Sequence, residues 1–235
     1  MFKKNFFPYL LCAASFVGAI ATGCSESSGM KSFKPGQIWS DNNGVHINAH
    51  GGGILFHNGK YYWYGEHKTE GEAGNVANVG VHCYSSTDLY NWTDEGIALS
   101  VDSVGSGSPI EKGCILERPK VIYNAKTGKY VMWFHLEPKG VGYKGAHSGV
   151  AVSDCVTGPF KLLHSGRVNP GKWALNLAEE LKDKPLPADE GPYSGGSLPK
   201  HPDSLNLPKR DFEGGQMARD MNLFVDDDGK AYHIY

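Results

Sequence analysis

The stretch that decides the fold is Asn48-Ala49-His50-Gly51-Gly52-Gly53-Ile54-Leu55-Phe56-His57-Asn58-Gly59-Lys60-Tyr61-Tyr62-Trp63-Tyr64-Gly65-Glu66. A glycine-rich approach leads into an apolar run, an Asn-Gly pair and a second run that is dense in aromatic residues. Asn-Gly between two such runs is the strongest short-range signal for a β-hairpin, because both turn positions need positive φ. We therefore predict two paired strands, with Glu66 where the second strand ends.

The same pattern returns twice further along the chain. Each copy has an apolar strand, a polar turn with Gly-Lys and an aromatic strand, and the copies span 53–64, 120–134 and 221–235. Further strands are expected at 79–86 and 148–154. Four-stranded units repeated around an axis form a β-propeller, because one unit cannot bury its faces alone. The sequence therefore predicts an all-β propeller, truncated here to about two blades and the start of a third.

The first 35 residues differ in composition from the rest of the chain. Residues 1–24 have a basic start, an apolar run and small residues at the end, as a secretory signal does. The end of this segment resembles a bacterial lipobox, in which Cys24 would carry the lipid; a plain signal peptide cleaved nearby is the alternative. Residues 25–35 are expected to be a flexible tether. We therefore expect a secreted protein, an outer-membrane or cell-surface lipoprotein of a Gram-negative bacterium, whose only membrane contact is its lipid anchor.

Residues 36–235 are expected to form the N-terminal part of one propeller domain. Seven prolines fall within residues 164–216, where they interrupt the repeat. Residues 173–182 of this insertion are expected to form a short helix. Long irregular loops in compact domains are usually functional, so we expect the insertion to shape the rim of a pocket.

Charge and cysteine content exclude several kinds of site. The formal net charge is −2 and no basic stripe is present, which argues against a nucleic-acid partner. Cys83, Cys114 and Cys155 are expected to include at least two buried free thiols, although one disulfide stays open as an alternative. Their spacing fits no zinc site, and 226–228 is better explained as a solvated turn than as a calcium loop. No cofactor is therefore expected, with a structural calcium ion at the propeller axis left open.

Two longer runs carry a family resemblance. They are Glu117-Arg118-Pro119-Lys120-Val121-Ile122-Tyr123-Asn124 and Arg219-Asp220-Met221-Asn222-Leu223-Phe224-Val225-Asp226-Asp227-Asp228-Gly229. With the repeats they resemble glycoside hydrolase family 43, and most closely the branch of exo-β-1,3-galactanases and related galactosidases. The resemblance covers residues 36–235 apart from the insertion. It implies a five-bladed β-propeller that hydrolyses glycosidic bonds with inversion, at a central site where carboxylates of different blades meet.

Inverting hydrolysis needs one carboxylic acid and one base across the sugar, and a third carboxylate beside the acid raises its pKa. By resemblance, Asp220 matches the carboxylate that tunes the acid; an aspartate that pairs with Arg219 or caps the backbone is the alternative. Glu117, expected just before the first strand of the second hairpin, contacts sugar hydroxyls by resemblance; an ion pair with Arg118 is its alternative. The sequence thus offers one catalytic candidate and one substrate-binding candidate in these two runs.

Three more residues complete the candidate substrate site. Glu66 is expected to face the same pocket, with a solvated loop position as an equal alternative. His50 lies at or near the place where most members of the family carry the aspartate base. A lone histidine beside glycines is more often a binding or structural residue, so we expect His50 to bind substrate. Tyr143, in a glycine-rich loop, is expected to line the pocket, and glycines 51–53 are expected to let the backbone approach the sugar.

The general acid is not recognisable in these residues. The resemblance implies a glutamate on the blade after the third hairpin, beyond Tyr235, so these 235 residues alone are expected to be inactive. The predicted function is hydrolysis of β-1,3-galactan or arabinogalactan-type plant polysaccharide. A carbohydrate-binding lipoprotein that kept the pocket and lost the base is the alternative. A sialidase-like function ranks last, because residues 86–92 lack the glycine of an Asp-box and no arginine cluster accompanies them.

Overall fold

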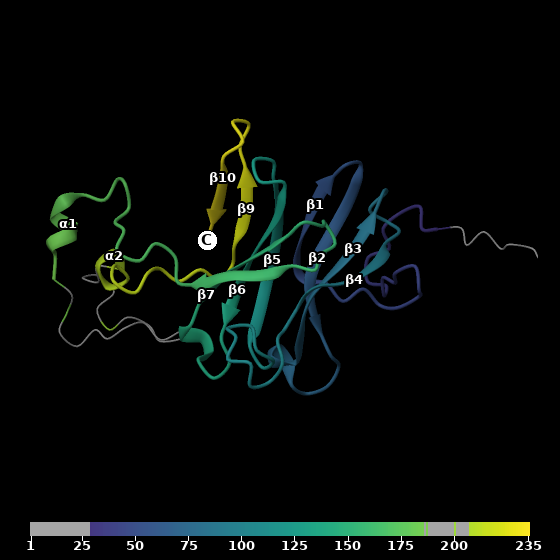
Figure 1. Ribbon diagram of the computed structural model, residues 1–235, viewed down its shortest axis with the longest axis horizontal. Coiled ribbons are helices and arrows are strands. Elements are labelled where there is room, and N and C mark those ends of the chain that lie inside the picture. Colours follow the sequence, from purple (N-terminus) through teal and green to yellow (C-terminus); the bar gives the residue numbers. More distant parts are fainter. Residues whose placement is uncertain (1–28, 186, 188–199, 201–206) are drawn as a thin grey trace, which may run out of the picture.

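The computed structural model describes residues 29–185, 187, 200 and 207–235 (Figure 1). The predicted signal segment, Cys24 and the first part of the tether lie outside these ranges, as does part of the insertion. Strands dominate the described residues, which confirms the all-β prediction. The helices within the described ranges have at most five residues, so none of them has the length or apolar character to cross a bilayer.

The first sheet is an antiparallel meander of four strands. Its order follows the chain: β1 (His50–His57), β2 (Lys60–Lys68), β3 (Asn78–Ser86) and β4 (Thr93–Ser100), with the short 3-10 helix η1 (Gly74–Ala77) before β3. Asn58 and Gly59 form the β1–β2 turn with φ of 50° and 79°, as the Asn-Gly pair predicts. Strand β2 continues to Lys68, so Glu66 lies inside the strand rather than at its end.

The second and third sheets repeat this plan. The second contains β5 (Ile115–Asn124), β6 (Lys129–Glu137), β7 (His147–Ser153) and β8 (Lys161–Gly166), with the 3-10 helix η2 (Gly142–Lys144) before β7. The third is the hairpin of β9 (Asn222–Val225) and β10 (Ala231–Ile234). All three predicted hairpins are therefore present. The described residues form no closed ring.

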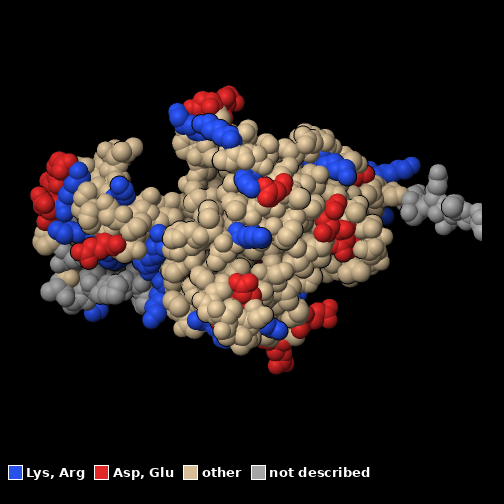
Figure 2. Space-filling model, viewed as in Figure 1, with Lys and Arg blue, Asp and Glu red and all other residues tan. Residues whose placement is uncertain are grey.

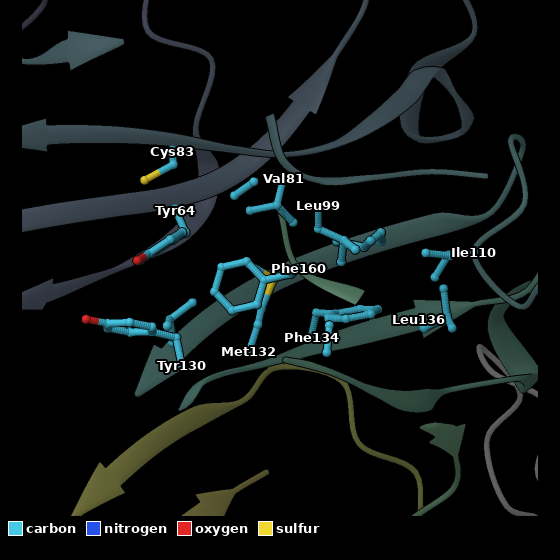
Figure 3. Close-up of a cluster of buried hydrophobic side chains, with 14 of the residues drawn as sticks. Tyr64, Val81, Cys83, Leu99, Ile110, Tyr130, Met132, Phe134, Leu136 and Phe160 are labelled. Atoms are coloured by element: carbon cyan, nitrogen blue, oxygen red, sulfur yellow. The ribbon is translucent and has the colours of Figure 1, made fainter. Parts of the chain in front are cut away.

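The main core lies between the first two sheets (Figure 3). Tyr64 and Val81 of the first sheet face Met132 and Phe134 of the second, and all four are fully buried. A Cβ on Gly149 would lie 2.2 Å from the Phe134 ring, so glycine on β7 makes room for this aromatic side chain. Burial of each large side chain contributes about 1.5–3 kcal/mol, which makes this interface the chief source of stability.

The insertion connects β8 to β9 and contains two short helices, α1 (Glu179–Asp183) and α2 (Leu207–Arg210). The Trp173 and Phe212 rings stack with centroids 4.2 Å apart, which joins its two ends. The expected helix at 173–182 begins later, at Glu179.

The three described cysteines are free thiols. Cys83 and Cys114 are buried and Cys155 is exposed, which confirms the expectation of at least two buried thiols and leaves no disulfide among them. Burial raises the pKa of the Cys114 thiol to about 11, so this group stays protonated at neutral pH.

Candidate active site

A polar hollow of about 480 Å³ lies where the inner strands β1 and β5 meet the start of β9. The side chains and backbone that line it come from all three sheets or from the segments just before them: Ala49, Gly51, Gly52, Trp63, Arg118, Lys120, Asp220 and Met221. The hollow therefore lies at the junction of the three repeats.

Strand β1 is bulged beside this hollow. Its pairing with β2 steps from His50↔Glu66 to Gly53↔Tyr64, so β1 has one residue more than β2 across this interval. Gly51 lies in the bulge with φ of 59°. A Cβ at Gly51 would lie 2.5 Å from Oε1 of Glu66. Glycine is thus needed here both for the left-handed backbone and for the close approach of the Glu66 carboxylate. The reason expected from the sequence was a different one, the close approach of the backbone to a sugar.

Strand β5 carries the same bulge at the matching position. Its pairing with β6 steps from Glu117↔His135 to Lys120↔Trp133. Arg118 lies in this bulge with φ of 57°, close to the value of its glycine counterpart in β1. Glu117 therefore corresponds to the first residue of the β1 bulge, and it lies inside β5 rather than before it.

The Glu66 carboxylate is buried, with only 1% of the side chain exposed. Oε2 lies 2.8 Å from Nζ of Lys68 and 3.2 Å from Nδ1 of His50, while Oε1 accepts a hydrogen bond from the Arg118 N–H at 3.1 Å. The alternative of a solvated loop residue is therefore wrong. A buried carboxylate persists only when it is paired and hydrogen-bonded, so these contacts fix the place of Glu66. The His50 side chain is 71% exposed beside it.

Asp220 and Glu117 differ in their pairing. Oδ1 of Asp220 lies 2.8 Å from Nε of Arg118, so Arg118 joins the second sheet to the segment before β9. The two alternatives invoked ion pairs between Asp220 and Arg219 and between Glu117 and Arg118. Neither pair is present in the described part of the chain, because Arg118 pairs with Asp220 instead. Glu117 is half-buried, and its carboxylate has no hydrogen bond or ion pair with the described residues. It is free to accept hydrogen bonds from a ligand.

Tyr143 lies in η2, beside the residue that precedes Asp220. The guanidinium of Arg219 lies over the Tyr143 ring, with Cζ 3.0 Å from the ring centre, and it also donates to the Tyr143 carbonyl. Tyr143 is 55% exposed and is not among the residues that line the hollow. Tyr143 thus contacts the residue before Asp220, but it does not line the hollow as the sequence prediction expected.

The sequence prediction missed a buried pair on β6. His135 and Glu137 are 2% and 4% exposed, with Nε2 and Oε1 3.2 Å apart. Nδ1 of His135 lies 2.9 Å from the Ala218 carbonyl, and Nη1 of Arg219 lies 3.9 Å from Oε1 of Glu137. Alignment of the repeats could have found this pair, because His135 corresponds in register to Glu66.

Lys68 and Lys120 were also missed. Lys68 neutralises Glu66, and Nζ of Lys120 donates to the carbonyls of Gly51 and Gly52 at 3.1 and 3.2 Å, which braces the β1 bulge from β5. Burial, followed by the charge of Arg118, lowers the pKa of Lys120, while Glu66 and Asp220 oppose this shift. Two cations and one carboxylate, Arg118, Lys120 and Asp220, thus line the hollow, and all three can hydrogen-bond to the hydroxyl groups of a neutral ligand.

Metal-binding groups are not apparent in the described ranges, where no three His, Cys, Asp or Glu side chains gather as ligands. Asp226, Asp227 and Asp228 lie at the exposed tip of the β9–β10 hairpin, where red and blue residues meet at the top of Figure 2. Asp228 pairs with Lys230 at 2.7 Å. This arrangement matches the expected solvated turn.

Comparison with known proteins identifies relatives among solved structures. No family model and no curated protein matches the chain. A GH43 β-1,3-galactosidase solved with galactodeoxynojirimycin is 56% identical over 85% of this chain and 57% of its own, with a TM-score of 0.76. An exo-β-1,3-galactanase from Clostridium thermocellum is 35% identical, with coverages of 84% and 34% and a TM-score of 0.57.

A third relative is the exo-β-1,3-galactanase from Phanerochaete chrysosporium solved with galactose. It is 31% identical over 85% of this chain and 35% of its own, with a TM-score of 0.59. The chain thus spans 57% of the length of the galactosidase and about a third of each galactanase. The shared identity extends over most of the chain, and the three hairpins lie where the resemblance requires them. The chain therefore belongs to glycoside hydrolase family 43, in the branch of the β-1,3-galactosidases and exo-β-1,3-galactanases.

Proposed function

We propose that the protein is an inverting glycosidase that releases galactose from β-1,3-galactan or arabinogalactan-type plant polysaccharide. The observation that carries this proposal is one open polar hollow where three sheets meet, lined by Asp220 and by Arg118, whose backbone N–H also contacts the buried Glu66. The 56% identity to a β-1,3-galactosidase supports the choice of sugar and linkage. Because the chain spans only 57% of that structure, the activity of the whole protein is inferred from the part that is shared.

The pairing of the carboxylates suggests their roles. Glu117 has no partner among the described residues, so it can accept hydrogen bonds from sugar hydroxyls. Glu66 is held in place by Lys68, His50 and the Arg118 N–H, and in this proposal it supports the wall of the same subsite. Asp220 is exposed to the hollow, where it can raise the pKa of a neighbouring acid by like-charge repulsion.

Hydrolysis with inversion then follows from two proton transfers. An acid protonates the glycosidic oxygen as its bond to C1 breaks, and a base removes a proton from the water that attacks C1 from the opposite face. We propose that the acid is a glutamate that none of the three described sheets carries, and that the base also comes from another blade. In this proposal the first two sheets are two blades of a five-bladed ring, and β9–β10 begins the third.

Anchoring by a lipid at Cys24 is part of the same proposal. A surface lipoprotein can hold such a site beside extracellular polysaccharide. Labelled fatty acid should be incorporated into the wild-type protein in cells and not into the Cys24→Ser variant, which should move to the soluble fraction. Equal labelling of both proteins would contradict lipidation at this residue.

The activity is tested by incubating the full-length protein with β-1,3-galactan, β-1,4-galactan and arabinan. Galactose is expected from β-1,3-galactan alone. The Asp220→Asn variant should lose about 100-fold or more in kcat, the usual scale for a group that assists proton transfer. Asp154→Asn is the matched control, because Asp154 is an exposed partner of Lys129 at the far end of its sheet. Tight binding of galactan without release of galactose would contradict the proposal and favour a carbohydrate-binding protein.

A further inference from the structure

We propose that Arg118 is a positioning residue that sets the places of Glu66 and Asp220 together, through its backbone N–H and its guanidinium respectively. The inference rests on the proposed function, since it concerns the same site. Arg118 belongs to the second sheet, whereas Glu66 belongs to the first and Asp220 precedes the third. One residue therefore contacts a carboxylate on either side of its own strand.

The backbone contact depends on an unusual conformation. Arg118 has φ of 57°, in the left-handed region that residues with a Cβ seldom occupy. In this conformation its N–H lies 3.1 Å from Oε1 of Glu66. The matching bulge of β1 places Gly51 at φ of 59°, where no Cβ is present. A strained backbone at a non-glycine residue persists where the surroundings hold it, and it is concentrated at functional sites.

Contacts around the bulge hold Arg118 in this backbone conformation. Lys120, two residues further along β5, donates to the carbonyls of Gly51 and Gly52 and lies 3.5 Å from the Arg118 carbonyl. The aliphatic Cδ of Arg118 would lie 3.5 Å from a Cβ at Gly51, so the two bulges face each other closely. The register of the two inner strands is thereby fixed at the level of Glu66.

The side-chain contact directs Asp220. Nε of Arg118 lies 2.8 Å from Oδ1 of Asp220, whose side chain is otherwise 87% exposed. An exposed carboxylate without such a partner would sample several rotamers. The planar guanidinium restricts its orientation as well as its distance. Arg118 touches neither reacting atom in this account, and it acts on the sugar only through the two carboxylates.

Three variants of the full-length protein separate the two contacts. Arg118→Gly keeps the N–H and tolerates positive φ, so KM for β-1,3-galactobiose should change by less than about 3-fold. The variant lacks the guanidinium that directs Asp220, so kcat should fall about 100-fold, the usual cost of a misplaced catalytic group. Arg118→Ala keeps the backbone strain of the arginine but lacks the ion pair with Asp220 that helps to hold it, so the bulge should relax, Glu66 should lose its N–H donor and KM should rise by a further factor of about 10. Lys129→Ala removes an exposed cation from the far end of the sheet and should leave both constants unchanged.

Each contact of Arg118 can be refuted separately. A wild-type kcat in Arg118→Gly would overturn the side-chain contact, and equal KM values in the glycine and alanine variants would overturn the backbone contact. If the wild-type protein releases no galactose, the proposed function fails instead. Positioning is then tested by the crystal structure of Arg118→Gly, in which Glu66 should stay in place and the Asp220 side chain should turn away. An unmoved Asp220 would refute the inference independently of activity.

Discussion

His135 and Glu137 form a buried pair on β6, with Nε2 and Oε1 3.2 Å apart. The other ring nitrogen of His135 lies 2.9 Å from the Ala218 carbonyl, which only accepts hydrogen bonds, so Nδ1 must carry a hydrogen. Nε2 then faces the Glu137 carboxylate. This pair therefore anchors the segment that leads to Asp220 onto the second sheet.

Removal of the imidazole should destabilise the domain. His135→Leu leaves Glu137 buried beside Arg219 at 3.9 Å, without its nearer partner, and we expect a loss of about 3 kcal/mol in the free energy of unfolding. Urea denaturation measures this loss. Glu137→Gln keeps a hydrogen-bonding group of the same shape and should lose less. A loss below about 1 kcal/mol for His135→Leu would show that the pair contributes no more than an exposed ion pair does.

A methyl group at Gly51 should disturb the site as well as the backbone. Gly51→Ala places a Cβ 2.5 Å from Oε1 of Glu66 in a left-handed conformation, so it should cost about 1–2 kcal/mol in backbone strain and also weaken galactose binding. Gly59→Ala is the matched control, because Gly59 has φ of 79° and open space around its Cβ position. Calorimetry with galactose should show lost affinity for the first variant alone. Equal galactose affinities of the two variants would show that the position of Glu66 does not affect sugar binding.

The charge of Glu66 should matter for sugar affinity. Glu66→Gln keeps the size of the side chain but removes the charge that pairs with Lys68 at 2.8 Å. The neutral amide would hold Lys68, His50 and the Arg118 N–H less firmly, and because these contacts support the wall of the hollow, we expect the Kd for galactose to rise about 10-fold. Titration calorimetry provides the value. An unchanged Kd, with the variant still folded by circular dichroism, would place Glu66 outside the sugar contacts.

Acidification should destabilise the protein through three half-buried histidines, His67, His147 and His233. Burial, then the charge of His82, lowers the pKa of His67 below its ordinary value of 6.5, although Asp94 opposes this shift; burial also lowers the pKa values of His147 and His233. The unfolded chain therefore binds more protons near and below pH 6.5, and stability falls as the pH decreases through that range.

His67→Gln tests this contribution directly. Nδ1 of His67 lies 2.8 Å from Nδ1 of His82, and a glutamine amide can donate to the same nitrogen without titrating. Unfolding midpoints in urea at pH 7.5, 6.5 and 5.5 should therefore decrease less steeply for the variant than for the wild-type protein. Identical slopes would assign the acid sensitivity to other groups.

The hairpins were predictable because their signals are local. The Asn58-Gly59 pair and the Gly-Lys dipeptides of the other two copies fix each turn within a few residues, and alternation of apolar and aromatic residues defines the strands on either side. The residues at which the strands end were not predictable from these local signals. Glu66 and Glu117 both lie within strands, because each bulge lets pairing continue past the point where the apolar pattern stops.

The contacts of the site depend on tertiary structure that no local pattern encodes. The left-handed conformation of Arg118 arises where two bulges face each other, and arginine carries no sequence signal for it. The burial of Glu66 depends on Lys68 and on a strand 52 residues further along the chain. Asp220 could be found from the family resemblance, but its pairing with Arg118 could not, since Arg118 lies in the second sheet and Asp220 in the segment before the third.

A crystal structure of the full-length protein with galactose tests the central claim most directly. The account predicts one galactose in the hollow between β1, β5 and the start of β9, with its hydroxyls within hydrogen-bond distance of Glu117 and with Asp220 at its edge. Galactose bound only elsewhere on the protein, with Glu117 and Asp220 both distant from it, would contradict the account.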